Sequence, residues 1–243
     1  MNDVTTESTI KTIGILGGMG PLATADLFRK IILRTDASSD RDHIHVFIDS
    51  NTSIPDRTEF ILGRGPSPLS EMVKSAIKLE MMGADIIVMP CNTAHYFYDD
   101  IKKYIKADFI NMIEETASEI MNSGKNVKTA LLATEGTCAA GVYDKVFAKK
   151  GMEMLKPEKE MQDIVTSVIY NVKKGLFDKY AGNLEKVINA MKKKGAELFI
   201  LGCTELPLYF ETLGIMEIIA DPTDILAKCA VKKAGKNVIS SAL

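Results

Sequence analysis

The sequence predicts an α/β fold built as two similar three-layer α/β/α lobes with mainly parallel sheets. Short apolar runs alternate with longer amphipathic runs along the chain, which is typical of parallel strands joined by crossover helices. The pattern also restarts halfway, because residues 12–16 with a glycine-rich turn resemble residues 129–133 with a polar turn. We therefore expect the carboxyl strand edges of the two lobes to face each other across a cleft, where open α/β sheets bind ligands.

The first half of the chain predicts four strands and three helices. The expected strands are 11–16, 44–48, 86–89 and 108–111, and the expected helices are 22–34, 68–82 and 94–104. Pro68 suits the first position of its helix, where a missing N–H costs little, and Ser67 is a candidate cap. Gly83 is expected to end this helix. A polar loop, 49–58, follows the second strand.

The second half repeats the alternation. The expected strands are 127–133, 198–201 and 217–220, and the expected helices are 113–122, 139–150, 160–174, 181–194 and 223–234. Asp221 and Pro222 are residue types preferred at the N-cap and first position of the last helix. We place the first lobe at residues 1–112, with segment 221–243 returning to it, and the second lobe at residues 113–220.

Composition argues against several classes of function. The 243 residues are 46% hydrophobic and 26% charged, as in ordinary soluble globular proteins. The formal net charge of -2 gives no general attraction to nucleic acid or to an anionic membrane. No apolar run approaches the roughly 20 residues of a membrane span, and residues 1–9 are polar rather than signal-like. We therefore expect a cytoplasmic protein that binds neither nucleic acid nor membrane.

The four cysteines are expected to be thiols, and with three histidines and no CxxC pair no metal site is expected. Cys91 and Cys203 follow apolar strands at equivalent points of the repeat, just before expected helix starts. Backbone N–H groups at such a helix start stabilise a thiolate or a bound carboxylate. Cys138 and Cys229 fall within predicted helices, where a packing role is expected.

Two thiols that face each other from different lobes form a pair able to invert a stereocentre. A thiolate on one face of a carbon atom removes a proton, and a thiol on the opposite face delivers one, so no cofactor is needed. The alternative interpretation is packing, because cysteine is among the most buried residue types.

Five motifs in order over nearly the whole chain support the acid and base interpretation. They are Gly17-Gly18-Met19-Gly20-Pro21, Ile54-Pro55-Asp56-Arg57-Thr58, Met89-Pro90-Cys91-Asn92-Thr93-Ala94-His95, Ala133-Thr134-Glu135-Gly136-Thr137 and Leu201-Gly202-Cys203-Thr204-Glu205. With these motifs the chain resembles the aspartate/glutamate racemase family, and most closely its aspartate racemases. The resemblance implies an enzyme independent of pyridoxal phosphate (PLP) and of any other cofactor. It also implies a homodimer, with the active site in the cleft between two α/β domains.

The resemblance also implies roles for individual residues. Cys91 and Cys203 are the expected catalytic pair, with Cys91 acting on the D form and Cys203 on the L form. Arg57 offers a fork that suits a carboxylate, and it is expected to act with Lys173, or with the neighbouring Lys174, on the substrate side chain. The other expected substrate-binding residues are Met19, Thr52, Asn92, Thr93, Thr134, Glu135, Gly136, Thr137 and Thr204. His95 and Glu205 are expected to support the two cysteines.

The expected activity is the interconversion of L- and D-aspartate, and other functions remain as alternatives. Glutamate or a broader set of amino acids is one, because a single methylene changes binding by only about 1–3 kcal/mol. A non-catalytic amino-acid-binding module is another, although loss of a cysteine or of Arg57 would favour it and both are retained. A nucleotide-binding role is disfavoured, since residues 17–20 lack both the G-x-G-x-x-G spacing and the P-loop lysine.

Overall fold

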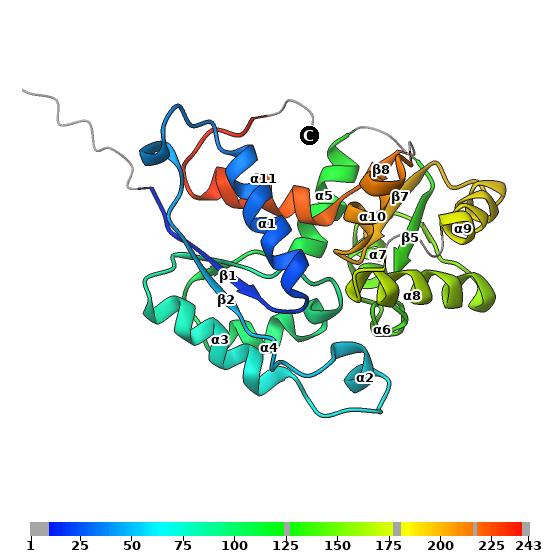
Figure 1. Cartoon of the computed structure of the whole chain (residues 1–243), viewed down its shortest axis with the longest axis horizontal. Helices are drawn as coiled ribbons and strands as arrows, with labels where there is room; N and C mark the ends of the chain where they lie inside the picture. The colour runs from blue at the N-terminus through cyan, green and yellow to red at the C-terminus, as the bar shows by residue number, and fades with distance from the viewer. Residues whose placement is uncertain (1–9, 124–126, 177–180, 216–217, 240–243) are drawn as a thin grey trace, which may run out of the picture.

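The computed structural model describes residues 10–123, 127–176, 181–215 and 218–239. The described residues form two α/β lobes with parallel sheets, as predicted (Figure 1). Each sheet has four strands, which is one more than predicted for the second lobe. The polar segment 1–9, residue 217 of the predicted strand 217–220 and residues 240–243 lie outside the described residues.

The first sheet has the strand order β2-β1-β3-β4. Its strands are β1 (Ile13–Gly17), β2 (Val46–Ser50), β3 (Ile86–Val88) and β4 (Asp108–Phe109). The helices around it are α1 (Pro21–Arg34), α2 (Arg57–Ile61), α3 (Leu69–Met81), α4 (Tyr98–Lys102) and α11 (Pro222–Lys233), with the 3₁₀ helices η1 (Asp40–Asp42) and η2 (Thr93–Phe97).

The second sheet has the strand order β6-β5-β7-β8. Its strands are β5 (Thr129–Ala133), β6 (Met154–Leu155), β7 (Leu198–Gly202) and β8 (Ile219–Ala220). Its helices are α5 (Met112–Asn122), α6 (Glu135–Ala140), α7 (Val142–Lys149), α8 (Lys159–Lys173), α9 (Ala181–Lys193) and α10 (Leu206–Leu213).

The two sheets have equivalent topologies, since β5 to β8 take the places of β1 to β4. Cys91 follows β3 and Cys203 follows β7, so the two cysteines lie beyond the carboxyl ends of equivalent strands. The internal repeat predicted from the sequence is therefore confirmed in the strand order and in the placement of both cysteines.

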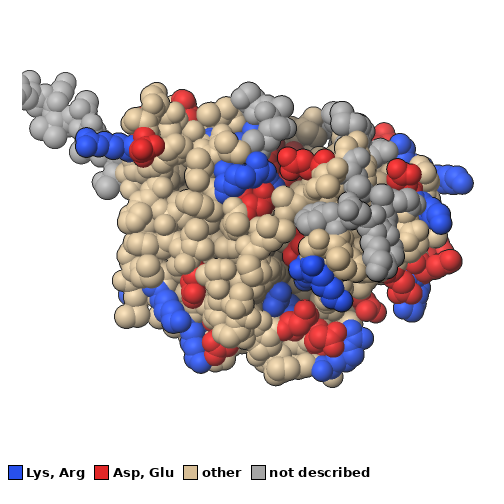
Figure 2. Space-filling view, in the orientation of Figure 1, with Lys and Arg blue, Asp and Glu red and all other residues tan. Residues whose placement is uncertain are grey.

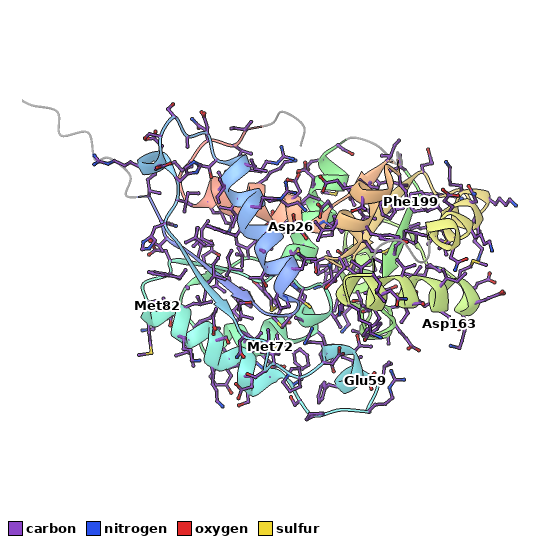
Figure 3. All side chains as sticks on the ribbon, viewed as in Figure 1. Asp26, Glu59, Met72, Met82, Asp163 and Phe199 are labelled. Atoms are coloured by element: carbon purple, nitrogen blue, oxygen red, sulfur yellow. The ribbon has the colours of Figure 1, made fainter. Side chains whose placement is uncertain are left out.

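Helices cover both faces of each sheet with apolar side chains. In the first lobe, α1 and α11 pack on one face and α3 on the other; Met72 belongs to the α3 side (Figure 3). In the second lobe, α8 and α9 pack on the face that includes Phe199, and α5 and α7 pack on the opposite face. Figure 1 shows α11 beside α1, so the C-terminal helix returns to the first lobe. The exact lobe boundaries stay a prediction.

A buried ion network fastens the returning helix. Lys30 on α1 bonds Asp26 on the same helix and Asp221 at the start of α11, each at 2.6 Å. Burial opposes the charge of Lys30, but the two carboxylates outweigh it and raise its pKa. Asp221 also caps α11 by accepting the Thr223 N–H at 2.8 Å, which confirms the predicted N-cap.

Some elements differ from the sequence prediction. Residues 94–104, expected as one helix, form the 3₁₀ helix η2 followed by the short α4. The predicted helix 139–150 is broken at Gly141, whose left-handed φ of 61° ends α6 before α7 begins. The elements α2, α10 and β6 were not predicted. Gly83, with φ of 99°, ends α3 as expected.

The surface carries both signs of charge. On the face in Figure 2, acidic and basic side chains are interspersed, in line with the small net charge. Among the helices of the described residues, none combines the length and apolar character needed to cross a membrane.

Candidate active site

The carboxyl ends of the two sheets border one small cavity. It measures about 10 Å³, roughly the space that a single water molecule requires. Residues from both lobes line it: Met19, Asp56, Arg57, Thr58, Cys91, Asn92, Thr93, Thr134, Lys173, Gly202, Cys203, Thr204 and Glu205. The two lobes are therefore closed on the cavity in this structure.

The cavity brings together both predicted catalytic cysteines and most of the predicted binding residues. The hydroxyl of Thr137 contacts the lining residue Thr93, while Glu135 and Gly136 are not among the lining residues. Thr52 also lies outside the lining and is exposed, because the surface turn around it is held by Ser53 bonding to the Asn51 side chain.

The turn that carries Cys91 is held through its backbone. The Cys91 N–H donates to the Met89 carbonyl at 2.9 Å, which makes a tight turn directly after β3. The Cys91 carbonyl lies 2.9 Å from Nδ1 of His95, and the Met112 N–H donates to Nε2 of the same ring at 3.1 Å. His95 thus contacts the backbone of the cysteine turn. The sequence alone did not show which group this side chain contacts.

His95 is a neutral imidazole in this environment. Because Nε2 accepts the Met112 N–H, the ring proton resides on Nδ1, and Nδ1–H donates to the Cys91 carbonyl. Burial lowers the pKa of His95 to about 4, although the carbonyls of Cys91 and Ile110 favour the charged ring.

Cys203 is a protonated thiol in the closed structure. Its Sγ–H donates to Oε2 of Glu205 at 2.9 Å. Burial raises the pKa of Cys203 well above its usual value, and the Glu205 charge adds to this, while Lys173 opposes it. A backbone N–H, that of Glu205, does favour the Cys203 thiolate as predicted, but burial and the Glu205 carboxylate outweigh it in this state. The helix α10 begins only at Leu206, and the buried carboxylate lies closer to the sulfur.

Arg57 is fixed by backbone carbonyls at the start of α2. Asp56 caps this helix by accepting the N–H groups of Thr58 and Glu59 at 2.7 and 3.0 Å. The Arg57 guanidinium then donates to Pro55 O at 2.9 Å and to Ile54 O and Met19 O, each at 3.3 Å. Its buried Nε has no hydrogen-bond partner among the residues that the structure describes. Three of the five guanidinium N–H groups are thus used, and two, including the Nε–H, remain as donors for an anion.

Lys173 supplies a second cation at the end of α8. Its ammonium lies 5.0 Å from the centre of the Tyr170 ring. Burial opposes the ammonium charge, but nearby acidic side chains outweigh it and raise the pKa of Lys173. These groups are Cys203, Glu205 and Cys91. Much of the residue is exposed, yet the side chain lines the cavity. Its stem therefore runs along the surface while the ammonium reaches inward.

Hydroxyl and amide groups complete the lining. The Thr93 hydroxyl from the first lobe lies 3.0 Å from that of Thr134 and 2.8 Å from that of Thr137, both in the second lobe. Asn92 accepts the Tyr143 hydroxyl at 2.6 Å, and its buried Nδ2 has no partner within the described part of the chain. These groups present donors from both lobes to one small volume.

Several residues at the site were not predicted. Asp56 and Thr58 line the cavity, Tyr143 orients Asn92, and Tyr170 lies beside Lys173. The first two belong to the Pro-Asp-Arg-Thr stretch already noted, so that motif carried a usable signal. The tyrosines occur within helices and carry no motif. Lys174, the alternative to Lys173, is exposed and does not line the cavity.

Comparison with known proteins identifies the family of this chain. The model of the Asp/Glu/hydantoin racemase family matches residues 16–230 of the chain. This chain belongs to that family. The family resemblance inferred from the five motifs is thereby confirmed.

Individual relatives agree with the assignment. Aspartate racemase from Picrophilus torridus is 33% identical, with a TM-score of 0.83 over 94% of this chain and 96% of that chain. The broad specificity amino-acid racemase RacX of Bacillus subtilis is 32% identical over 227 residues, covering 90% of this chain and 96% of its own length. Glutamate racemase from Francisella tularensis, solved in complex with D-glutamate, has a TM-score of 0.67 at 17% identity, covering 93% of this chain and 81% of that chain, and shares the fold. The chain is a racemase of the Asp/Glu racemase family, which acts on amino acids.

Proposed function

We propose that this racemase interconverts L- and D-aspartate without PLP or another cofactor, using Cys91 and Cys203 as its acid and base. One observation carries the proposal. A cysteine from each lobe lines the same closed cavity, and a guanidinium and an ammonium, those of Arg57 and Lys173, line it with them.

The charges at the cavity favour a substrate with two carboxylates. Arg57 and Lys173 are both cationic, and their distal groups can hold the side-chain carboxylate of the substrate. The buried Nδ2 of Asn92 and the threonine hydroxyls remain as neutral donors for the α-carboxylate. An amino acid with an uncharged side chain would leave one buried cation without a partner, which costs binding energy.

The proton balance follows from the protonation of the two thiols. Cys203 holds its proton against Glu205 in the closed state, so it is the proton donor when Cys91 acts as the thiolate base. Cys91 removes the Cα proton of the D form, and Cys203 delivers its own proton to the opposite face, which gives the L form. The reaction ends with Cys91 protonated and Cys203 as thiolate, and this form is ready for the reverse reaction.

The cations also lower the barrier to proton removal. A Cα–H is a very weak acid, so the developing negative charge must be stabilised by groups that are already in place. Arg57 is held by three carbonyls before any ligand arrives. Closure of the lobes to a cavity of about 10 Å³ excludes water and strengthens these interactions.

Circular dichroism of amino acids incubated with dialysed enzyme tests the proposal. L-Asp, D-Asp, L-Glu and D-Glu are followed separately, with Cys91→Ser and Cys203→Ser as inactive references. We expect the circular dichroism signal of both aspartate enantiomers to decay to zero, and that of the glutamate enantiomers to change more slowly. A requirement for added PLP, or activity that persists in both serine variants, would contradict the mechanism.

A second candidate is a racemase of broader specificity. It is favoured by the 32% identity to the broad specificity amino-acid racemase RacX over 90% of this chain. The same assay with L-Ala, L-Lys and L-Arg separates the two candidates. Comparable rates on these amino acids would favour the broader activity.

The location and oligomeric state that we propose for the enzyme rest on the family resemblance. We propose a cytoplasmic homodimer. Light scattering coupled to size-exclusion chromatography tests the dimer, for which a mass of twice 26.6 kDa is expected.

A further inference from the structure

We infer that His95 is a positioning residue that sets the place of Cys91. Its ring joins the cysteine turn to the crossover, the stretch from β4 to α5 by which the chain passes from the first lobe to the second. The inference rests on the proposed function, in which Cys91 is a reacting group. It is carried by the two hydrogen bonds of one buried ring, to Cys91 on one side and to Met112 on the other.

The bond to Met112 completes the start of α5. The first N–H groups of a helix have no acceptor within the helix. Asn111 caps α5 by accepting the N–H groups of Ile113 and Glu114 at 3.0 and 3.2 Å. The Met112 N–H is left, and Nε2 of His95 accepts it at 3.1 Å. The ring thus acts as part of the helix cap, although it belongs to η2 of the first lobe.

The same segment holds the crossover at a second point. The Tyr98 hydroxyl donates to the Phe109 carbonyl of β4 at 2.6 Å, and the two rings stack with centroids 4.7 Å apart. The rings of His95 and Tyr98 are nearly parallel, at 7° with centroids 6.1 Å apart. The strand β4 is the last strand of the first sheet and α5 follows it directly, so both contacts fall where the chain leaves that sheet.

The helix α5 belongs to the core of the second lobe. Ile113, Ala117 and Ile120 pack in one cluster with β5 and β7, and β7 leads to Cys203. A continuous path therefore runs from the Cys91 carbonyl through the ring to α5 and on to the second sheet. On this path His95 bonds directly both to the Cys91 carbonyl and to the first residue of α5.

The arrangement requires one tautomer of an uncharged ring. A second proton on Nε2 would face the Met112 N–H donor and break the cap. The neighbours that act on the charge of the ring are the backbone carbonyls of Cys91 and Ile110. The ring is therefore suited to fixing geometry rather than to exchanging protons with substrate.

Two amide substitutions separate the two contacts. In His95→Asn the side-chain amide reaches the place of Nδ1 and keeps the bond to Cys91 O, and the Met112 bond is lost. In His95→Gln the amide reaches the place of Nε2 and keeps the Met112 bond, and the Cys91 bond is lost. Tyr98→Phe is the matched control, because it removes a contact to the crossover without touching the Cys91 turn.

The tests are kinetics, thiol reactivity and nitrogen NMR of the full-length enzyme. We expect His95→Gln and His95→Asn to lower kcat at least tenfold with less change in KM, and Tyr98→Phe to lower Tm with kcat within threefold. Iodoacetamide should modify Cys91 of His95→Gln at a rate changed at least threefold, with the Cys203 rate unchanged. The ¹⁵N shifts should show a proton on Nδ1 of His95 in the wild type.

Two results would overturn the inference. One is an Nε2–H tautomer, and the other is wild-type kcat in both amide variants together with a lowered Tm, which indicates a purely structural role. Alkylation and NMR do not depend on turnover. If the wild-type enzyme racemises nothing, the proposed function fails while these two measurements still test the role of His95.

Discussion

The Cys203 thiol donates to the Glu205 carboxylate over 2.9 Å, with both side chains buried. The carboxylate also faces the first lobe, because a Cβ placed on Gly20 would lie 3.4 Å from Oε1 of Glu205. The contact keeps the proton on Cys203 in the closed state and distinguishes the two cysteines chemically. Cys203 is therefore expected to be the less reactive thiol of the resting enzyme.

Replacement of Glu205 by glutamine tests this difference. Glu205→Gln removes the negative charge that raises the pKa of Cys203, so its thiolate fraction at neutral pH should rise. Mass spectrometry should show alkylation of Cys203 by iodoacetamide accelerated at least fivefold, and alkylation of Cys91 is the internal control. Equal acceleration at both cysteines would indicate a general opening of the cavity instead.

Arg57 should be sensitive even to a conservative change. Arg57→Lys keeps the charge but loses the planar fork that three carbonyls hold in place. A charge-assisted contact contributes roughly 1.5–3 kcal/mol, so kcat/KM for aspartate should fall at least tenfold. Arg64→Lys is the control, because Arg64 follows the same helix and pairs with Glu59 at the exposed surface. Equal losses in both variants would contradict the assigned role.

The contact between Gly136 and Thr58 should limit closure of the lobes. A Cβ at Gly136 would lie 2.6 Å from the Thr58 hydroxyl and 2.8 Å from its Cα, and the backbone atom cannot rotate away. Gly136→Ala should therefore hold α2 and α6 apart and lower kcat more than tenfold, with little change in Tm. Ala139→Ser, at an exposed position of α6, is the matched control. Full activity of Gly136→Ala would show that this close approach is not needed for catalysis.

His95 should make stability depend on pH. Its pKa falls from 6.5 in the unfolded chain to about 4 in the fold, mainly through burial. Below pH 6.5 the unfolded state binds a proton on His95 that the folded state does not bind. The free energy of unfolding is therefore highest above this pH and decreases as pH falls towards 4. Each unit of pKa shift corresponds to about 1.4 kcal/mol, so the full loss of folding stability, reached near pH 4, is about 3 kcal/mol. Urea titrations at pH 7, 6 and 5 should show about 2 kcal/mol of this loss by pH 5 in the wild type relative to His95→Gln. A constant difference between the two proteins would contradict it.

The strands and the cysteine positions could be predicted because they depend on strong local patterns. Residues 86–89 and 198–201 are continuous apolar runs, which indicate strands buried on both faces. Parallel topology then places the residue after each strand at the same edge of its sheet. The structure has both features, and the two sheets repeat one strand order.

Short elements could not be predicted in the same way. The helix α2 has five residues, fewer than two turns, so no apolar periodicity develops. In α10 the apolar residues lie on all sides, so no amphipathic pattern indicates a helix. Pro207 also argues against a helix in the sequence, although proline is tolerated in a first turn. The two-residue strand β6 gains its hydrogen bonds from β5, so its identity depends on the fold rather than on its own residues.

The chemistry of the site required the three-dimensional arrangement. The sequence placed Glu205 near Cys203 but did not show that it accepts the thiol proton. It also left open which atoms His95 contacts, since the ring bonds a residue far along the chain at Met112. Thr52 lies in an exposed turn in which the Ser53 N–H donates to the Asn51 side chain, and no motif in the sequence indicated this exposure.

The most direct test of the account is deuterium incorporation at Cα at early times in D₂O, with substrate and product separated by enantiomer. If Cys91 and Cys203 act from opposite faces, L-aspartate formed from D-aspartate carries deuterium while the remaining D-aspartate stays unlabelled. The reverse reaction should show the mirror pattern. Equal labelling of substrate and product from the first turnovers would indicate a single base and would contradict a mechanism that uses one sulfur from each lobe.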